Sequence, residues 1–251
     1  MIRSGLVSIT FRKLSAEEIV ALVREAGLEG IEWGGDVHVP HGDLDRAREV
    51  RRMTEDAALT VAAYGSYYRV GHEEPVPFEE VLTTAVALGA PLIRVWAGEQ
   101  GSDQADAAYR ELVVRDSRRI ADAAAREGIA VAYECHANSL TDTTASACAL
   151  LESVAHDNVR TYWQPAVGAS VETCLEGIDA LRDRLANVHV FHWEAWDRRP
   201  LAEGQDPWRG YLEKIASTGR EHFAMLEFVA DDCPDAFRRD AATLRQWLQD
   251  L

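Results

Sequence analysis

The strongest constraint on the fold is a strand-length apolar run that recurs eight times along the chain. The runs begin near Ser4, Leu28, Leu59, Pro91, Ile129, Val159, Asn187 and Phe223. Segments with helical periodicity lie between them, and this alternation is typical of a parallel sheet covered by helices. Eight such units in 251 residues match a closed barrel better than an open doubly wound sheet. We therefore predict a single α/β domain, a (β/α)8 TIM barrel, over residues 1–251.

Local signals mark where several of the helices begin and end. Ser15 and Glu18 have the spacing of a capping box, and Gly27 follows the helix that they open. A longer helix is predicted over residues 104–126, and Pro234 suits the first turn of the last helix. No glycine-rich phosphate-binding motif follows the first strand, which disfavours the common nucleotide-binding folds.

The charge and the cysteine pattern limit the partners and the compartment. Asp and Glu number 42 against 26 Lys and Arg, which gives a net charge of −16 that repels nucleic acid and anionic membranes. No apolar run is long enough to span a membrane, and the first run reaches charged Arg12 too soon for a signal peptide. The four cysteines are widely spaced, as expected for core residues of an intracellular protein. We expect a cytoplasmic protein.

Four runs in the second half of the chain end on side chains that can bind a metal ion. These residues are Glu134, Gln164, His189 and Glu227. In a TIM barrel the carboxyl ends of the strands carry the chemistry, and period-two alternation directs Glu134 and Glu227 towards the axis. Two carboxylates in one barrel mouth repel each other unless protons or a cation intervene. A divalent ion is the simplest solution.

The other two members of this set leave alternatives open. Alternation in NVHVFHW puts His189 and His192 on opposite faces, and we favour His189 as the ligand. Gln164 offers an amide oxygen, a weaker donor than a carboxylate, so either the metal binds loosely or the site holds none. The mixed oxygen and nitrogen set fits Mn²⁺, Mg²⁺, Co²⁺ or Zn²⁺, with Mn²⁺ favoured because oxygen predominates.

Aromatic and polar side chains gather near the other strand ends and predict a pocket for a small polyhydroxylated or ring-shaped molecule. The expected substrate contacts are Trp33, His38, Tyr68, Arg94, Trp96, His136, His192, Trp193 and Arg198. The two arginines are equally consistent with structural ion pairs, and His38 with a solvent-exposed loop residue.

The whole chain resembles the xylose isomerase-like barrel superfamily, which contains sugar epimerases, inosose dehydratases and apurinic endonucleases. The resemblance is carried by GLVSITF followed by a capped helix and GLEGIEW, and by YECH, NVHVF and MLEF further along. It implies that Glu134, His189 and Glu227 match the metal ligands of that group. Gln164 stands where the group normally has Asp, and Val167 where a His often follows. Arg198 is near the position of a substrate-binding Arg.

The resemblance implies a metal-dependent isomerase or epimerase of a sugar or sugar phosphate. Its acid/base pair would be Glu134 and Glu227, transferring a proton alpha to a carbonyl. A dehydratase of the inosose dehydratase kind uses the same enolising chemistry, and a metal-free ligand-binding barrel is a further alternative. A nuclease is disfavoured by Gln164, Val167 and the net charge. Related barrels are often dimers or tetramers, so a homo-oligomer is in keeping with the resemblance.

Overall fold

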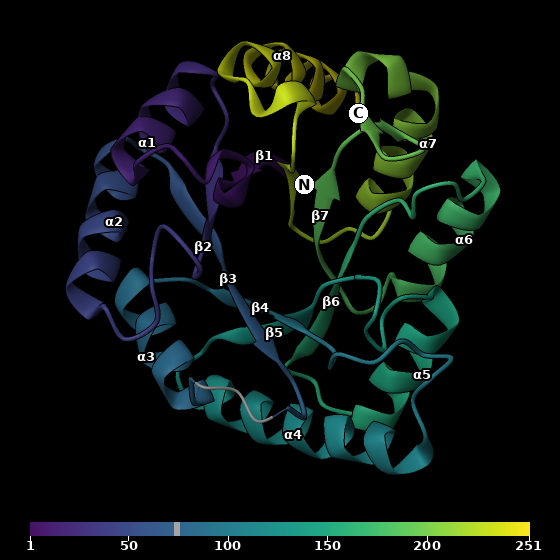
Figure 1. Ribbon diagram of the computed structural model, residues 1–251. Coiled ribbons are helices and arrows are strands. Elements are labelled where there is room, and N and C mark those ends of the chain that lie inside the picture. Colours follow the sequence, from purple (N-terminus) through teal and green to yellow (C-terminus); the bar gives the residue numbers. More distant parts are fainter. Residues whose placement is uncertain (73–75) are drawn as a thin grey trace.

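The computed structural model describes residues 1–72 and 76–251, which form a closed barrel of parallel strands (Figure 1). The eight barrel strands among these residues are β1 Ile2–Val7, β2 Gly30–Gly34, β3 Thr60–Arg69, β4 Leu92–Trp96, β5 Ala130–Tyr133, β6 Val159–Trp163, β7 Leu185–Val190 and β10 His222–Leu226. Pairing of β10 with β1 closes the ring. The predicted fold class, a (β/α)8 barrel, is confirmed.

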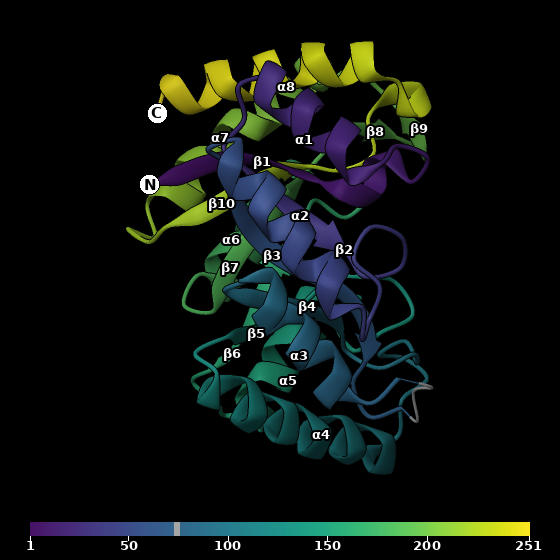
Figure 2. The ribbon, with the colours of Figure 1, turned by 90° about the vertical axis from the view of Figure 1, so that its left-hand side faces the viewer.

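The helices form an outer ring around the strands (Figures 1 and 2). They are α1 Ala16–Glu25, α2 Leu44–Asp56, α3 Phe78–Leu88, α4 Ala107–Arg126, α5 Thr144–Val154, α6 Val171–Leu181, α7 Gln205–Ala216 and α8 Pro234–Gln249. The predicted capping box opens α1: the Ser15 hydroxyl accepts from the Glu18 amide, and the Glu18 carboxylate accepts from the Ser15 amide. The predicted long helix starts at Ala107 because Asp106 caps it.

Two predicted strands end earlier than their apolar runs. In GLVSITF the strand stops at Val7, and Ser8–Phe11 continues as the 3-10 helix η1. In NVHVFHW the strand stops at Val190, and a small antiparallel hairpin follows, made of β8 Trp193–Glu194 and β9 Asp197–Arg198. Two further 3-10 helices, η2 Leu201–Gly204 and η3 Ala230–Asp232, lie in the last two loops at this end.

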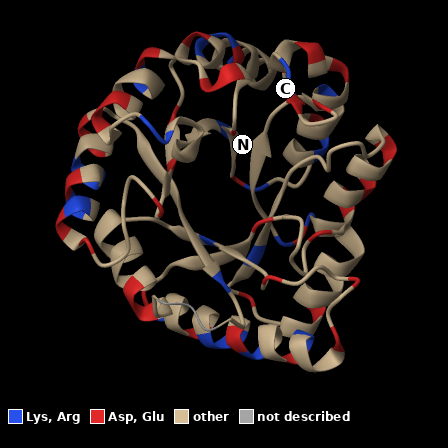
Figure 3. Cartoon of the chain, in the orientation of Figure 1, with Lys and Arg blue, Asp and Glu red and all other residues tan. Residues whose placement is uncertain are grey.

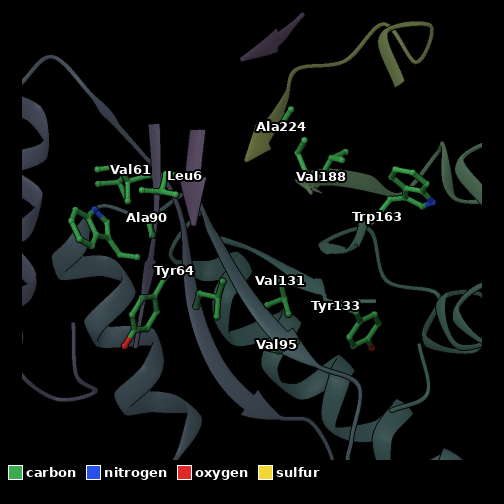
Figure 4. Close-up of a cluster of buried hydrophobic side chains, with 14 of the residues drawn as sticks. Leu6, Val61, Tyr64, Ala90, Val95, Val131, Tyr133, Trp163, Val188 and Ala224 are labelled. Carbon is green, nitrogen blue, oxygen red and sulfur yellow. The ribbon is translucent and has the colours of Figure 1, made fainter. Parts of the chain in front are cut away.

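Alternation along the strands separates two apolar layers. Val131, Tyr133 and Val188 point outwards into the large core between the sheet and the helices (Figure 4). Ala132 and Met225 belong instead to a smaller cluster inside the barrel. The next inward positions on these strands are polar, so the barrel interior changes from apolar to charged towards the carboxyl ends.

Most charged residues lie on the outer helices (Figure 3). Within the described ranges, every helix is too short or too polar to cross a membrane. The charged groups at the barrel axis are therefore a distinct set, and they define the candidate site.

Candidate metal centre and substrate cavity

Four predicted ligands meet around one ring nitrogen at the carboxyl end of the barrel. His189 Nδ1 lies 3.0 Å from Gln164 Oε1, 3.3 Å from Glu227 Oε2 and 3.7 Å from Glu134 Oε1. His189, Glu134 and Glu227 are buried, and Gln164 is half-buried. The structure thus brings together the four residues that the sequence pattern proposed.

The donor set fits a divalent ion. The ligand atoms of Glu134, His189 and Glu227 all lie within 4.8 Å of one another. With metal–ligand bonds of about 2.1 Å, neighbouring ligand atoms of an octahedral ion are about 3 Å apart. The distances from His189 Nδ1 to the three ligand oxygens range from 3.0 to 3.7 Å, close to this spacing. Small side-chain shifts would therefore suffice for the four groups to enclose an ion. Two carboxylates, an imidazole and an amide oxygen suit Mn²⁺ or Mg²⁺.

A buried ion-pair network lies beneath this group. The Arg94 guanidinium donates from Nε to Glu32 Oε1 at 2.6 Å and from Nη1 to Glu134 Oε2. The Trp96 indole donates to the same Glu134 oxygen at 2.5 Å, and the Tyr162 hydroxyl donates to Glu32 Oε2 at 2.7 Å. Glu134 Oε2 therefore accepts hydrogen bonds from two donors, which fix its carboxylate at the cavity floor.

Electrostatics lower the pKa of two buried carboxyl groups at this centre, those of Glu32 and Glu227. Burial raises the pKa of the Glu32 carboxyl, but the charges of Arg94 and His189 and the hydrogen bonds outweigh it and lower the pKa to about 2. Burial also raises the pKa of Glu227, and the charge and hydrogen bond of His189 then bring it below its ordinary value.

The pKa of the His189 imidazole is raised, in contrast to those of Glu32 and Glu227. Burial lowers its pKa, yet the charges of Glu227 and Glu32 prevail and raise it to about 10. Without a metal, His189 is therefore an imidazolium, and its positive charge balances part of the negative charge of the surrounding carboxylates. Its Nε2 is buried and has no hydrogen-bond partner among the described residues; the nearest carboxylate oxygen is Glu32 Oε2 at 3.9 Å. If Nδ1 held a metal ion, the ring proton would be on Nε2, on the side of Glu32, and a carboxylate there is the usual support for a histidine ligand.

A cavity of about 700 Å³ opens above these charges. Its floor includes Arg94, Glu134, Gln164 and Glu227, and its walls are largely aromatic: Tyr67, Trp96, Phe191, Trp193, Trp196 and Phe228. On one wall the rings of Trp96 and His136 are stacked, with centroids 4.6 Å apart. Aromatic walls with a few convergent polar groups suit a small ring-shaped ligand. Arg94, Trp96, His136 and Trp193, all predicted as substrate contacts, line it.

Three other predicted contacts lie outside the cavity, because their side chains point into the protein. Trp33 is on the outward face of β2, where its indole donates to Thr54. Both ring nitrogens of His38 are engaged, by the Ser8 hydroxyl and the Leu14 carbonyl.

Tyr68 also turns away, and its hydroxyl contacts Asp116 and Arg119. Its neighbour Tyr67 faces the cavity instead, because it has a positive φ of 58° near a register irregularity between β3 and β4.

The remaining two predicted contacts lie behind the wall. His192 lines a separate recess next to Gly204. The Arg198 guanidinium stacks on Phe228 and Trp193, 4.8 and 5.8 Å from their ring centroids, and forms an ion pair with Asp232. Arg198 thus supports the aromatic wall from outside the cavity lining.

Sequence reasoning missed Glu32, Tyr162 and the aromatic residues Tyr67, Trp196 and Phe228. Glu32 carried a usable signal, since it follows the buried Ile31 at a strand end in the same way as Glu134 follows Tyr133. Tyr162 lies two residues before Gln164 on the same inward face of β6. The positions of Tyr67 and Trp196 depend on positive-φ turns that the sequence gives no sign of.

The fold and the site together define a (β/α)8 barrel with a buried carboxylate–imidazole centre at the carboxyl ends of its strands. This chain belongs to the xylose isomerase-like TIM barrel family, whose model matches residues 20–251.

Similarity to individual proteins extends along nearly the whole chain. A 3-dehydroshikimate dehydratase of Bacillus anthracis is 24% identical, covering 96% of this chain and 95% of that protein. A solved structure of a probable 3-DHS dehydratase from the same organism has a TM-score of 0.82 at 23% identity, covering 98% and 99% of the two chains. D-psicose 3-epimerase of Clostridium cellulolyticum, solved with D-tagatose, has a TM-score of 0.73 at 15% identity, covering 98% of each chain. The relatives thus include both a dehydratase and an epimerase.

Proposed function

We propose that this protein is a metal-dependent dehydratase that removes a β-hydroxyl group from a small cyclic hydroxyketone, with 3-dehydroshikimate as the first substrate to test. The observation that carries the proposal is His136, which lines the same aromatic-walled cavity as the anionic centre and whose Nε2 has no hydrogen-bond partner among the described residues. The full-length similarity to a 3-dehydroshikimate dehydratase supports the choice of substrate.

The centre suits an enolising elimination. Removal of a proton alpha to a ketone leaves negative charge on the carbonyl oxygen, and loss of the β-hydroxyl then forms a carbon–carbon double bond. A divalent ion held by Glu134, Gln164, His189 and Glu227 would stabilise that negative charge. With 3-dehydroshikimate, loss of one water and tautomerisation give the aromatic 3,4-dihydroxybenzoate.

His136 is our candidate for the proton transfers. Its Nδ1 lies 2.7 Å from the Ala137 carbonyl oxygen, which can only accept a hydrogen bond, so Nδ1 carries the proton. Its Nε2 forms no hydrogen bond with any described residue and is the ring nitrogen that we assign as the proton acceptor. Stacking on Trp96 holds the ring at the cavity wall. His136 would take the α-proton at Nε2 and return it to the leaving hydroxyl, so that water departs and the imidazole is neutral again.

Glu134 and Glu227 are then better suited to holding the metal than to moving protons. Glu134 Oε2 already accepts hydrogen bonds from Arg94 and Trp96, so that oxygen is not free to take a proton from a substrate. Glu227 is held by the charge of His189. This arrangement differs from the acid/base pair expected from the sequence.

An epimerase acting on a ketose is the second candidate. It is favoured by one specific feature: Glu134 and Glu227 come from strands β5 and β10, with β6 and β7 between them in the barrel. A substrate bound between the two carboxylates would offer one face to each, as a two-base proton exchange requires. The similarity to a D-psicose 3-epimerase is in keeping with this alternative.

Turnover assays separate these candidates. Protein supplied with Mn²⁺ is incubated with 3-dehydroshikimate or with D-psicose, and products are identified by chromatography and near-ultraviolet absorbance. We expect 3,4-dihydroxybenzoate from the first substrate and no sugar interconversion. His136→Asn should lower kcat by about 100-fold or more, the usual contribution of a general base. The matched control is His192→Asn, because His192 lies outside the cavity, and its kcat should be close to that of wild type.

The outcomes contradict different parts of the proposal. Wild-type kcat in His136→Asn would refute its role as base, and sugar interconversion without dehydration would favour the epimerase. Full activity after removal of divalent ions by EDTA would refute the metal requirement. If Glu134→Gln and Glu227→Gln both kept wild-type metal affinity, their assignment as ligands would be lost.

A further inference from the structure

The β8–β9 hairpin carries a large aromatic side chain at its tip, at the rim of the cavity. Trp193 pairs with Arg198 and Glu194 with Asp197, so the turn consists of Ala195 and Trp196 alone. Trp196 lines the cavity and is 73% exposed, the largest exposure of any large aromatic residue in the described chain. Such exposure of an indole has no stabilising value for the isolated fold.

The backbone of this turn is unfavourable for the residues that occupy it. Ala195 has a φ of 47° and Trp196 a φ of 82°. Two-residue hairpin turns with two positive φ values strongly prefer Asn-Gly, because a Cβ atom disfavours this conformation. Strain of this kind tends to occur where function requires a particular side chain.

The base of the hairpin, in contrast, is firmly packed. Trp193 lies against Phe191, with ring centroids 4.6 Å apart, and Arg198 covers Trp193 from the other side. The ion pair of Arg198 with Asp232 ties the hairpin to the loop after β10. The indole N–H of Trp193 is buried and has no partner among the described residues, so ring packing and the Arg198 contact hold this side chain. A fixed base therefore holds an exposed indole beside the aromatic wall.

We propose that Trp196 is a specificity-determining residue that stacks on the unsaturated ring of the bound substrate and covers it from the solvent side. The inference rests on the proposed function for the nature of the ring. The wall formed by Phe191, Trp193 and Phe228 supports one side of the cavity, and Trp96 stacked on His136 forms another. An indole gains more from stacking on a flat ring that has a π-face of its own than on a puckered, saturated one.

The test measures binding, so that it does not depend on turnover. Isothermal titration of the Mn²⁺-loaded protein uses 3,4-dihydroxybenzoate as the flat probe and myo-inositol as the saturated one. Trp196→Ala should weaken binding of the flat probe by about tenfold, which is about 1.4 kcal/mol, and Trp196→Phe by less than about threefold, because Phe keeps part of the stacking. Binding of the saturated probe should change by less than about twofold.

A double variant separates a binding role from a structural one. Ala195→Asn with Trp196→Gly installs the preferred turn sequence, so we expect a higher Tm than wild type together with the same tenfold loss of affinity for the flat probe. A lower Tm would show that Trp196 stabilises the fold and would overturn the proposal.

Unchanged affinity of Trp196→Ala, an equal loss for both probes, or no binding of the flat probe to wild type would also overturn it. If wild type binds the flat probe through Trp196 but does not dehydrate 3-dehydroshikimate, this inference stands and the proposed function fails.

Discussion

Replacing Glu32 by Gln tests whether the buried ion-pair network beneath the cavity stabilises the fold. The Glu32 carboxylate is fully buried and accepts hydrogen bonds from Arg94 at 2.6 Å and from Tyr162 at 2.7 Å. Gln has nearly the same size and keeps one acceptor oxygen. The substitution therefore removes mainly the negative charge, and it leaves Arg94 with Glu134 as its remaining carboxylate partner.

The magnitude follows from the pKa of Glu32. Its value falls from 4.5 to about 2 in the folded protein. At about 1.4 kcal/mol per pKa unit, the ionised carboxylate contributes about 3 kcal/mol to the free energy of unfolding near pH 7. Breaking a buried ion pair usually costs about 3 to 5 kcal/mol, and the lower end applies here because Arg94 keeps one partner. We expect Glu32→Gln to cost about 3 kcal/mol.

Urea unfolding of the protein in EDTA measures this cost without any contribution from metal binding, and an unchanged m-value would validate the comparison. Glu213→Gln is the control, since Glu213 pairs with Arg209 at 3.1 Å on the exposed face of α7. Exposed pairs are worth little, so the control should lose less than about 0.5 kcal/mol.

The pH dependence gives a second check on the same variant. Because folding lowers the pKa of Glu32, its contribution is fully present above pH 4.5 and is lost as the pH falls towards 2. The difference between wild type and Glu32→Gln should therefore about halve by pH 3. A cost no larger than that of Glu213→Gln, or one that stays constant between pH 7 and pH 3, would refute the reasoning.

Three further predictions concern metal binding, capping and acid stability. Gln164→Asp adds a charged ligand and should tighten Mn²⁺ binding by tenfold or more in isothermal titration; equal affinity would place residue 164 outside the coordination sphere. Ser15→Ala removes the α1 cap and should cost about 1 kcal/mol in urea unfolding, whereas no loss would show that Glu18 suffices. Burial lowers the pKa of His38 and of His222. Protonation of these two side chains below about pH 6.5 therefore destabilises the fold, so Tm should fall between pH 7 and pH 5. The fall in Tm should be less steep in His38→Gln. If Tm fell equally steeply in wild type and in this variant, His38 would not contribute to the acid sensitivity.

The sequence predicted those features that depend on periodicity alone. The eight apolar runs located the barrel strands, and alternation directed Glu134 and Glu227 inwards. On the seventh strand it left either His189 or His192 facing inwards, and the structure has the favoured His189 there. The same alternation, applied to GIEW, puts Glu32 inside the barrel and Trp33 outside. The expectation that Trp33 lines the pocket rests on its ring size and strand-end position and disregards this outward direction.

The aromatic wall was less predictable because it depends on irregular backbone. Whether Tyr67 or Tyr68 faces the cavity is decided by one residue with positive φ where the β3–β4 register shifts. His38 lies in a turn after β2, and only the folded position of Ser8 and Leu14 shows that its ring is already bonded. Local pattern carries no information on such contacts between distant segments.

The charges at the barrel axis offer a physical reason for the neutral Gln164. Glu32, Glu134 and Glu227 supply three negative charges, and Arg94 supplies one permanent positive charge. With His189 as imidazolium the centre has a net charge of about −1, and exchange of that proton for a divalent ion brings it to zero. An Asp in place of Gln164 would leave one uncompensated negative charge in the loaded site and two in the metal-free site. It would therefore tighten metal binding but destabilise the fold, because unbalanced charge in a buried site costs several kcal/mol. Because Glu32 and Arg94 are part of the same network, the amide need not signal a lost metal site. A neutral side chain at position 164 suits the charge balance of a centre in which Glu32 already provides a third carboxylate beside Glu134 and Glu227.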